Sequence, residues 1–175
     1  DQAPSSCRAP PSATLTLRNP CRPFARLLLC PGHRIGPVMP HHFPIRVYYE
    51  DTDLAEIVYY ANYLRFIERG RTEWVRTLGI DQGELKRQAG IVFAVRRVEA
   101  DYLSPARFDD LLTVETRLLD LTAARIVLDQ TVLRGEDRLF QATVTLVALT
   151  DAGRPARIPA EIRQRLAAEG PRSGM

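Results

Sequence analysis

The sequence predicts one α+β domain in which a long helix lies beside a five-stranded, mostly antiparallel sheet. The chain has 175 residues, which fits the roughly 100–200 residues that are usual for a single domain. Residues 58–78 repeat apolar side chains at helical spacing, and four strand-like segments with short connections follow them. Together with one strand before the helix, this order of elements favours an α+β layer arrangement.

The first strand is expected at Ile45–Glu50, because this segment combines β-branched and aromatic residues. The long helix is expected at Val58–Leu78, with Gly79 as its stop signal. Its predicted apolar face consists of Ala61, Leu64, Ile67, Trp74, Val75 and Leu78. The charged residues expected largely on its solvent side are Glu68, Arg69, Arg71, Glu73 and Arg76.

A short helix over Gln82–Gln88 and a terminal helix over Ala160–Ala168 are expected on either side of the remaining strands. Those strands are expected at Ile91–Leu103, Leu111–Leu119, Arg125–Arg134 and Leu139–Thr150. Gly135-Glu136-Asp137 predicts a hairpin turn between the last two of them. One sheet wrapped on a single helix leaves its other face without cover, so we expect the protein to be at least a dimer.

The charge of the chain is unevenly distributed. Residues 1–38 hold five arginines and one acid, a net +4, which leaves 19 basic and 20 acidic residues, a net −1, for residues 39–175. The first segment also contains seven of the 13 prolines and all three cysteines, whose spacing matches no disulfide framework or metal site. We expect a disordered extension at residues 1–38: a targeting peptide, a regulatory arm or, as we favour, sequence upstream of a true start at Met39.

The residue inventory of the 39–175 domain excludes several classes of chemistry. Its only histidines are His41 and His42, which precede the predicted first strand, and its only serines are Ser104 and Ser173. It has no nucleophile elbow, no zinc-binding cluster and no glycine-rich nucleotide loop, so we expect no metal or other cofactor. A membrane-spanning run of about 20 apolar residues and a basic, aromatic pattern for nucleic acid are also missing. If the domain is an enzyme, a carboxylate is its expected active group.

Carboxylates are densest in Glu50–Glu56, between the predicted first strand and the long helix. A calcium loop of the EF-hand type would need Gly at position 6 and Glu at position 12, and counting from Asp51 these positions hold Glu56 and Asn62. A second interpretation is a helix entry, where acids favour the positive end of the helix dipole.

The same segment resembles a known family signature. Residues 46–63, RVYYEDTDLAEIVYYANY, are similar to the signature of the 4-hydroxybenzoyl-CoA thioesterase family, and most of all to its bacterial acyl-CoA thioesterase branch associated with the Tol–Pal system. Phe66–Arg69 and Tyr102–Asp110 also resemble the family, and the resemblance covers about residues 44–166. It implies a hot-dog fold, a cytoplasmic hydrolase of acyl-CoA thioesters, and homodimers or homotetramers with active sites between subunits.

The resemblance also implies roles for individual residues. Asp53 matches the family's catalytic aspartate, which acts as a nucleophile or as a base on water. The backbone N–H of Tyr60 matches the donor to the thioester carbonyl at the start of the helix. Arg107 and Arg125 are candidate contacts for the CoA phosphates, or else surface ion-pair arginines.

Two positions depart from the family pattern. Glu56 stands where the family usually has glycine, which places a further carboxylate near Asp53, and Tyr60 stands where this branch often has histidine. Two other functions remain open. One is a hot-dog hydratase or dehydratase, which would need a histidine with an acid, and the other is a non-catalytic domain that binds acyl-CoA or a protein.

Overall fold

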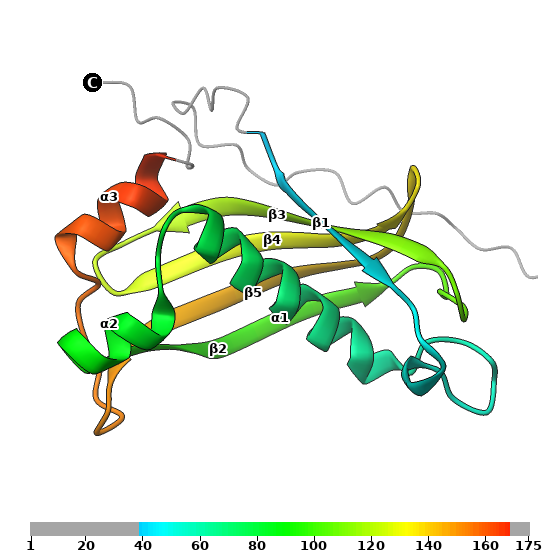
Figure 1. Ribbon diagram of the computed structural model, residues 1–175, viewed down its shortest axis with the longest axis horizontal. Coiled ribbons are helices and arrows are strands. Elements are labelled where there is room, and N and C mark those ends of the chain that lie inside the picture. Colours follow the sequence, from blue (N-terminus) through cyan, green and yellow to red (C-terminus); the bar gives the residue numbers. More distant parts are fainter. Residues whose placement is uncertain (1–38, 169–175) are drawn as a thin grey trace, which may run out of the picture. The chain divides into compact units, whose positions relative to one another are not determined.

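A five-stranded antiparallel sheet curves around the long helix α1, Tyr60–Thr77, in the computed structural model, which describes residues 39–168 (Figure 1). The strands are β1 (His41–Arg46), β2 (Ile91–Tyr102), β3 (Leu111–Leu121), β4 (Arg125–Arg134) and β5 (Asp137–Thr150). Their order in the sheet is β1-β3-β4-β5-β2, so β1 and β2 are the edge strands. The predicted α+β architecture is confirmed, while the extension expected at residues 1–38 lies outside the described residues.

Three shorter helices accompany this core: the 3-10 helix η1 (Tyr49–Asp51), α2 (Gln82–Ala89) and α3 (Ala160–Ala168). Helix α2 begins at Asp81, whose carboxylate accepts the Glu84 N–H at 2.9 Å and thereby has its pKa lowered. It ends at Gly90, which adopts the left-handed conformation that glycine tolerates best. Both expected short helices are therefore present, within one residue of their predicted bounds.

The predicted first strand at Ile45–Glu50 is wrong by about four residues. Strand β1 runs from His41 to Arg46, and the chain then turns into η1 because the Asp51 carboxylate accepts the Tyr48 N–H at 2.9 Å. The expectation that both histidines precede the sheet is also wrong, since His41 and His42 lie in β1. The His42 Nε2 lies 2.9 Å from a Glu115 carboxylate oxygen on β3, so the sheet does contain a histidine–acid pair.

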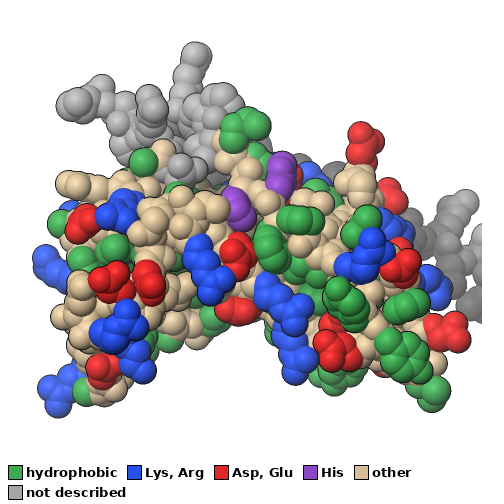
Figure 2. All heavy atoms as spheres, viewed as in Figure 1, with side chains coloured by type: hydrophobic (Ala, Val, Ile, Leu, Met, Phe, Trp, Pro, Cys, Tyr) green, Lys and Arg blue, Asp and Glu red, His purple; other side chains and the backbone are tan. Residues whose placement is uncertain are grey.

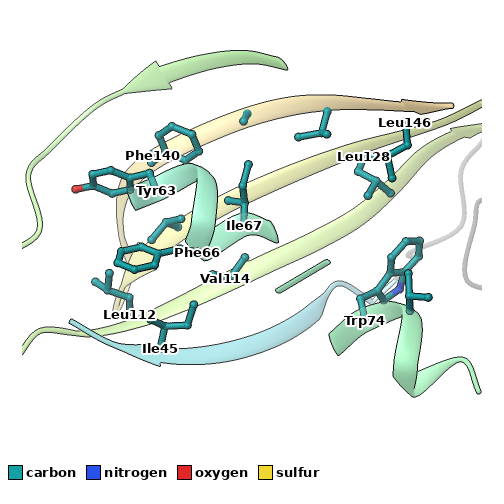
Figure 3. Close-up of a cluster of buried hydrophobic side chains, with 14 of the residues drawn as sticks. Ile45, Tyr63, Phe66, Ile67, Trp74, Leu112, Val114, Leu128, Phe140 and Leu146 are labelled. Carbon is teal, nitrogen blue, oxygen red and sulfur yellow. The ribbon is translucent and has the colours of Figure 1, made fainter. Parts of the chain in front are cut away.

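Helix α1 packs its buried side chains into the concave face of the sheet (Figure 3). The buried residues of the helix are Asn62, Tyr63, Phe66, Ile67, Gly70, Trp74 and Val75. The buried face of α1 is therefore rotated about the helix axis relative to the predicted one, because Leu64 remains 39% exposed while Tyr63 and Phe66 are buried. Gly70 permits the closest approach to the sheet, since a Cβ built there would lie only 2.6 Å from Val114 Cγ1.

Arg71 does not lie on the solvent side of α1 as expected. Arg71 is half-buried, and its guanidinium donates to the side-chain oxygen of Gln130 at 2.8 Å, while Gln130 itself is fully buried in β4. Periodicity could not reveal this contact, because it depends on a polar residue in the sheet that faces the helix.

Charges of both signs are interspersed on the face that Figure 2 shows, in keeping with the nearly neutral 39–175 segment. Among the helices formed by residues 39–168, none is both long and apolar enough to cross a membrane.

Candidate active site

Asp53 lies at the start of a tight hairpin loop that connects η1 to α1. The Asp53 N–H donates to the Ile57 carbonyl at 3.0 Å, and the Glu56 N–H donates to the Asp53 carbonyl at 2.9 Å. Glu56 closes the turn with φ of 59°, a left-handed conformation that a three-residue hairpin requires at this position. The sequence departure at Glu56 therefore falls on a residue whose backbone favours glycine.

The Asp53 carboxylate is oriented by its own loop. One of its oxygens, Oδ1, accepts the Ala55 N–H at 2.9 Å, an arrangement typical of an Asp that initiates a turn. The residue is exposed, and the described residues provide no other hydrogen-bond donor to this carboxylate. The second oxygen is therefore accessible to a substrate or a water molecule.

Asp51 connects the hairpin to the first turn of α1. Its backbone carbonyl accepts the Tyr59 N–H at 2.9 Å and the Asn62 side-chain amide at 3.0 Å. Asp51 is 4% exposed and Asn62 is 5% exposed, so both bonds are shielded from water. Sequence reasoning overlooked these two residues as positioning groups. The sequence shows Asp51 only as one of several acids in residues 50–56. An asparagine on the buried side of an amphipathic helix was the signal that could have identified Asn62.

The backbone N–H of Tyr60 is free to meet a ligand. Tyr60 is the first residue of α1, preceded by the cap residue Tyr59, whose side chain makes no capping hydrogen bond. The first amides of a helix have no acceptor within the helix, and the helix dipole adds a positive field at this end. The carbonyl of Asp51 is taken up by the Tyr59 amide, and no described acceptor contacts the amide of Tyr60.

Asp53 and the start of α1 are close enough to interact electrostatically. The pKa of the Tyr59 phenol is raised, first by the hydrogen bond and charge of Tyr60, then by burial, and then by the charge of Asp53. The charge of Asp53 therefore reaches the phenol of the residue that caps the helix.

Aromatic side chains form a wall beside the helix start. The rings of Tyr59 and Tyr60 lie 4.6 Å apart, and Tyr102 from β2 contacts Tyr60 edge-on at 6.4 Å. The Tyr102 hydroxyl also donates to the Tyr60 carbonyl at 3.2 Å. Behind them, Tyr63 stacks on Phe140 at 5.2 Å. Strand β2 is thereby tied to the first turn of α1.

A pocket of about 660 Å³ opens next to Asp53. It is lined by Tyr49, Thr52, Asp53, Leu54, Glu56, Arg107 and Phe108. Figure 2 shows hydrophobic side chains at the surface on the side where Figure 1 places the loop after β1. Leu54 and Tyr49 are the two most exposed large hydrophobic residues among those described. The pocket combines an apolar rim with charges of both signs.

Arg107 lines the same pocket as Asp53, and its contact with CoA phosphates stays a prediction. Its loop is fixed by the Asp110 carboxylate, which accepts the Arg107 N–H at 2.8 Å and the Arg134 guanidinium at 2.9 Å. The Arg107 side chain itself lines the pocket that contains Asp53 and Glu56.

Arg125 is not brought to this pocket within one chain. It begins β4, whose other end is Arg134, so the two lie about 30 Å apart at about 3.3 Å per residue. Its guanidinium donates to the Asp120 carboxylate at 2.7 Å on the surface. The ion-pair interpretation describes the contact that Arg125 makes in a single subunit.

Groups of three or more His, Cys, Asp or Glu side chains that could hold a metal ion are not found among residues 39–168. The acidic residues of 50–56 include the buried Asp51 and the exposed Asp53 and Glu56, which serve different parts of the loop. The structure thus offers an exposed carboxylate at Asp53 and, at Tyr60, a helix-start amide without a described acceptor.

Comparison with known proteins finds relatives that match most of the described chain. An acyl-CoA thioesterase from Haemophilus influenzae, YbgC, is 43% identical over 123 residues, which are 69% of this chain and 90% of the relative. The acyl-CoA thioester hydrolase YbgC of Escherichia coli is 35% identical over 128 residues, which are 70% and 95% of the two chains. A probable thioesterase from Bartonella henselae superposes with a TM-score of 0.66 at 39% identity, covering 69% of this chain and all of that one.

The match extends through the hairpin, α1 and the whole sheet except β1. The family model described as the thioesterase-like superfamily matches residues 47–166, and the predicted resemblance over about residues 44–166 and the hot-dog fold are confirmed. The chain therefore belongs to the thioesterase-like superfamily.

Proposed function

We propose that the protein hydrolyses acyl-CoA thioesters, releasing CoA and a free carboxylic acid. One observation carries the proposal. The chain has an oriented, accessible carboxylate at Asp53 just before α1, and the Tyr60 N–H at the start of α1 has no described acceptor. The acyl-CoA thioesterase names of the two YbgC relatives support the same activity.

The Tyr60 N–H would hold the thioester carbonyl oxygen. Negative charge that develops on this oxygen during attack is stabilised by the amide and by the helix dipole. One such donor contributes about 2.7–4 kcal/mol in comparable sites. The same interaction polarises the carbonyl carbon toward the attacking group.

Asp53 would act on the carbonyl carbon in one of two ways. As a nucleophile, its free oxygen forms an acyl-aspartyl anhydride while the C–S bond breaks and CoA leaves as a thiolate, and water then hydrolyses the anhydride. As a base, Asp53 takes a proton from a water molecule that attacks the carbon directly. Mass spectrometry of protein quenched during turnover separates the routes, because only the first adds the acyl mass to the peptide that contains Asp53.

The binding role of the pocket is assigned from its lining. Arg107 is the candidate partner for a CoA phosphate, because it is the cation that lines the pocket of Asp53. Glu56 places a second carboxylate in the same pocket, which would weaken the attraction for phosphate.

A homodimer or homotetramer is part of the proposal. The pocket is open in the single chain, with Tyr49 82%, Leu54 102% and Phe108 59% exposed. Edge strand β2 also presents the exposed apolar residues Val95 and Val98. Analytical ultracentrifugation tests this, and a monomer at micromolar concentration would contradict it.

A cytoplasmic location and an association with the Tol–Pal system are further proposals that rest on the family resemblance. Cell fractionation tests the first, and co-purification with Tol–Pal components tests the second.

The function is tested by thiol release from a panel of acyl-CoA substrates. Asp53→Asn should lower kcat by at least about a hundredfold, the lower bound for loss of a positioned acid–base group. Asp137→Asn is the matched control, since Asp137 is an exposed acid at the start of β5, away from the pocket of Asp53. Full activity of Asp53→Asn would contradict the mechanism.

A non-catalytic acyl-CoA-binding or protein-interaction domain is the second candidate, favoured by the extra carboxylate of Glu56 beside Asp53. Calorimetry that shows acyl-CoA binding without any thiol release would support it instead. The hydratase alternative can no longer be set aside for want of a histidine in the sheet. The His42–Glu115 pair, however, does not line the pocket of Asp53.

A further inference from the structure

A second cavity, of about 240 Å³, lies between the later turns of α1 and the sheet. Its apolar lining includes Trp74, Val75, Phe93, Val95, Ile126 and Leu146. One cation, Arg71, and one carboxylate, Glu68, also line it. None of these residues lines the pocket that contains Asp53.

Gln130 holds Arg71 at the wall of this cavity. The Gln130 side-chain nitrogen donates to the Ile67 carbonyl at 2.8 Å and to the Thr116 hydroxyl at 3.0 Å, so both of its hydrogens are used. Its oxygen must therefore face Arg71, whose guanidinium donates to it at 2.8 Å. Gln130 thus fixes the position of the guanidinium and, being neutral, does not itself neutralise its charge.

Arg71 has donors to spare. A guanidinium carries five N–H groups, and within residues 39–168 the Arg71 guanidinium makes one hydrogen bond, to the neutral Gln130. None of the ion pairs in this part of the chain includes Arg71. Burial lowers its pKa, while the charge of Glu68 acts in the opposite direction. Glu68 is exposed and accepts the Thr72 hydroxyl at 2.8 Å.

The cavity and the Tyr60 amide lie on the same face of α1, because residues spaced three or four apart share one face of a helix. The row on this face is Tyr60, Leu64, Glu68 and Arg71. Tyr60 and Arg71 are eleven residues apart, which is about 16 Å along the helix at 1.5 Å per residue. Strand β2 follows this face, with Tyr102 against Tyr60 at one end and residues 93 and 95 at the cavity. Within one subunit the two sites are therefore distinct, and they share one flank of α1.

We propose that this cavity binds a small organic carboxylate, with the apolar body against Trp74 and Phe93 and the carboxylate on Arg71. A guanidinium with unused, adjacent N–H groups suits the two oxygens of a carboxylate. The volume lies below the roughly 300–1,000 Å³ of sites for drug-sized ligands, so a compact acid fits it best. The binding of a carboxylate does not depend on the proposed function, but the origin of the ligand does. Thioester hydrolysis would supply the ligand either as the released acid or as the acyl group of a substrate that carries a carboxylate at its far end.

Trp74 provides the measurement, because it is the one tryptophan of the chain and it lines the cavity. The full-length protein is titrated with hexanoate and, as an uncharged match, with hexanamide, while tryptophan fluorescence is recorded. Hexanoate should saturate the signal with an affinity at least about tenfold higher than that of hexanamide, since charge-assisted hydrogen bonds are the stronger ones. Equal affinities, or no saturable response to hexanoate, would overturn the proposal.

Variants of Arg71 test the assignment. Arg71→Met should abolish the preference for acid over amide, Arg71→Lys should retain part of it, and Arg69→Met, on an exposed position of the same helix, should leave it unchanged. An undiminished preference in Arg71→Met would refute the role of Arg71. If circular dichroism shows that Arg71→Met does not fold, the role of Arg71 is tested by two other results. These are the partial preference for acid over amide in Arg71→Lys and the full preference in the parent protein.

Further controls separate this site from the proposed activity and identify the ligand's source. Asp53→Asn should leave hexanoate binding intact, so the cavity can be confirmed even if no thioester is hydrolysed. With an active enzyme, Arg71→Met should lower the ratio of kcat/KM for adipyl-CoA over hexanoyl-CoA if the ligand is a distal carboxylate. It should instead relieve inhibition by hexanoate if the ligand is the free acid. If Arg71→Met changes neither the ratio of kcat/KM values nor the inhibition by hexanoate, the ligand is neither the distal carboxylate of a substrate nor the released acid.

Discussion

Replacing Tyr60 by proline would remove the proposed oxyanion donor with little harm to the helix. Proline has no N–H, and it is favoured at the first position of a helix because that N–H has no partner inside the helix. Tyr60 occupies this position, and the preceding Tyr59 has φ of −57° and ψ of 130°, an extended backbone that a following proline accepts. The hydrogen bond from Tyr59 N–H to Asp51 is untouched by the change.

The loss expected for Tyr60→Pro is about 10²–10³ in kcat, the range found when one oxyanion-hole donor is removed. Tyr60→Ala is the matched control, because it removes the same aromatic ring and keeps the N–H. Both variants lose the ring contacts with Tyr59 and Tyr102, and both keep the Tyr60 carbonyl that accepts the Tyr102 hydroxyl. The ratio of the two kcat values therefore isolates the amide.

The assay is thiol release at saturating acyl-CoA, with circular dichroism and thermal melting to show that both variants are folded. If Tyr60→Pro and Tyr60→Ala are equally active, the Tyr60 amide does not stabilise the oxyanion and the proposed geometry is wrong.

Three other predictions follow from the backbone and the packing. Glu56→Gly relieves a left-handed conformation that costs an L-residue about 1–2 kcal/mol, and should raise Tm by a few degrees after the larger unfolded-state entropy of glycine is subtracted. Glu56→Ala removes the same carboxylate and keeps the strain, so an equal gain in both variants would assign the effect to charge. Gly70→Ala should destabilise the fold by about 1–3 kcal/mol in urea unfolding, because its Cβ would crowd Val114, and Val114→Ala should restore part of the loss. The lowered pKa of Asp81 means that its ionised form stabilises the fold above the ordinary Asp pKa of about 3.9 and ceases to as the pH falls through the folded value. Asp81→Ala should therefore lower Tm at pH 7, with a difference that shrinks in melts below pH 4, and a constant difference would contradict the cap.

The sequence was sufficient to predict the elements whose pattern is local. Strand β5 alternates buried and half-buried residues from Phe140 to Leu149, and α2 carries its own start and stop signals at Asp81 and Gly90. The bounds of β1 were mistaken because the aromatic residues after Arg46 favour a strand, while a local hydrogen bond from the Tyr48 N–H to the Asp51 carboxylate turns the chain into η1.

The candidate site could be predicted only as far as the family resemblance reached. Asp53, Tyr60 and Arg107 were anticipated, and the structure groups Asp53 with Arg107 in one pocket and places Tyr60 at the start of α1. The supporting role of Asn62 depends on a backbone carbonyl eleven residues away, which no local pattern encodes. The burial of Arg71 likewise depends on Gln130, in a strand 59 residues later.

The double use of the Asp51 carbonyl has a consequence for motion. Tyr59 and Asn62 both donate to this one oxygen, so the segment that precedes the hairpin and the first helical turn are held together at a single buried atom. A fluctuation that displaces the hairpin must carry the helix start with it or break two shielded hydrogen bonds, each costing about 1 kcal/mol or more. Substrate entry can therefore shift the exposed rim at Leu54 and Phe108 while the separation between Asp53 and the Tyr60 amide is preserved.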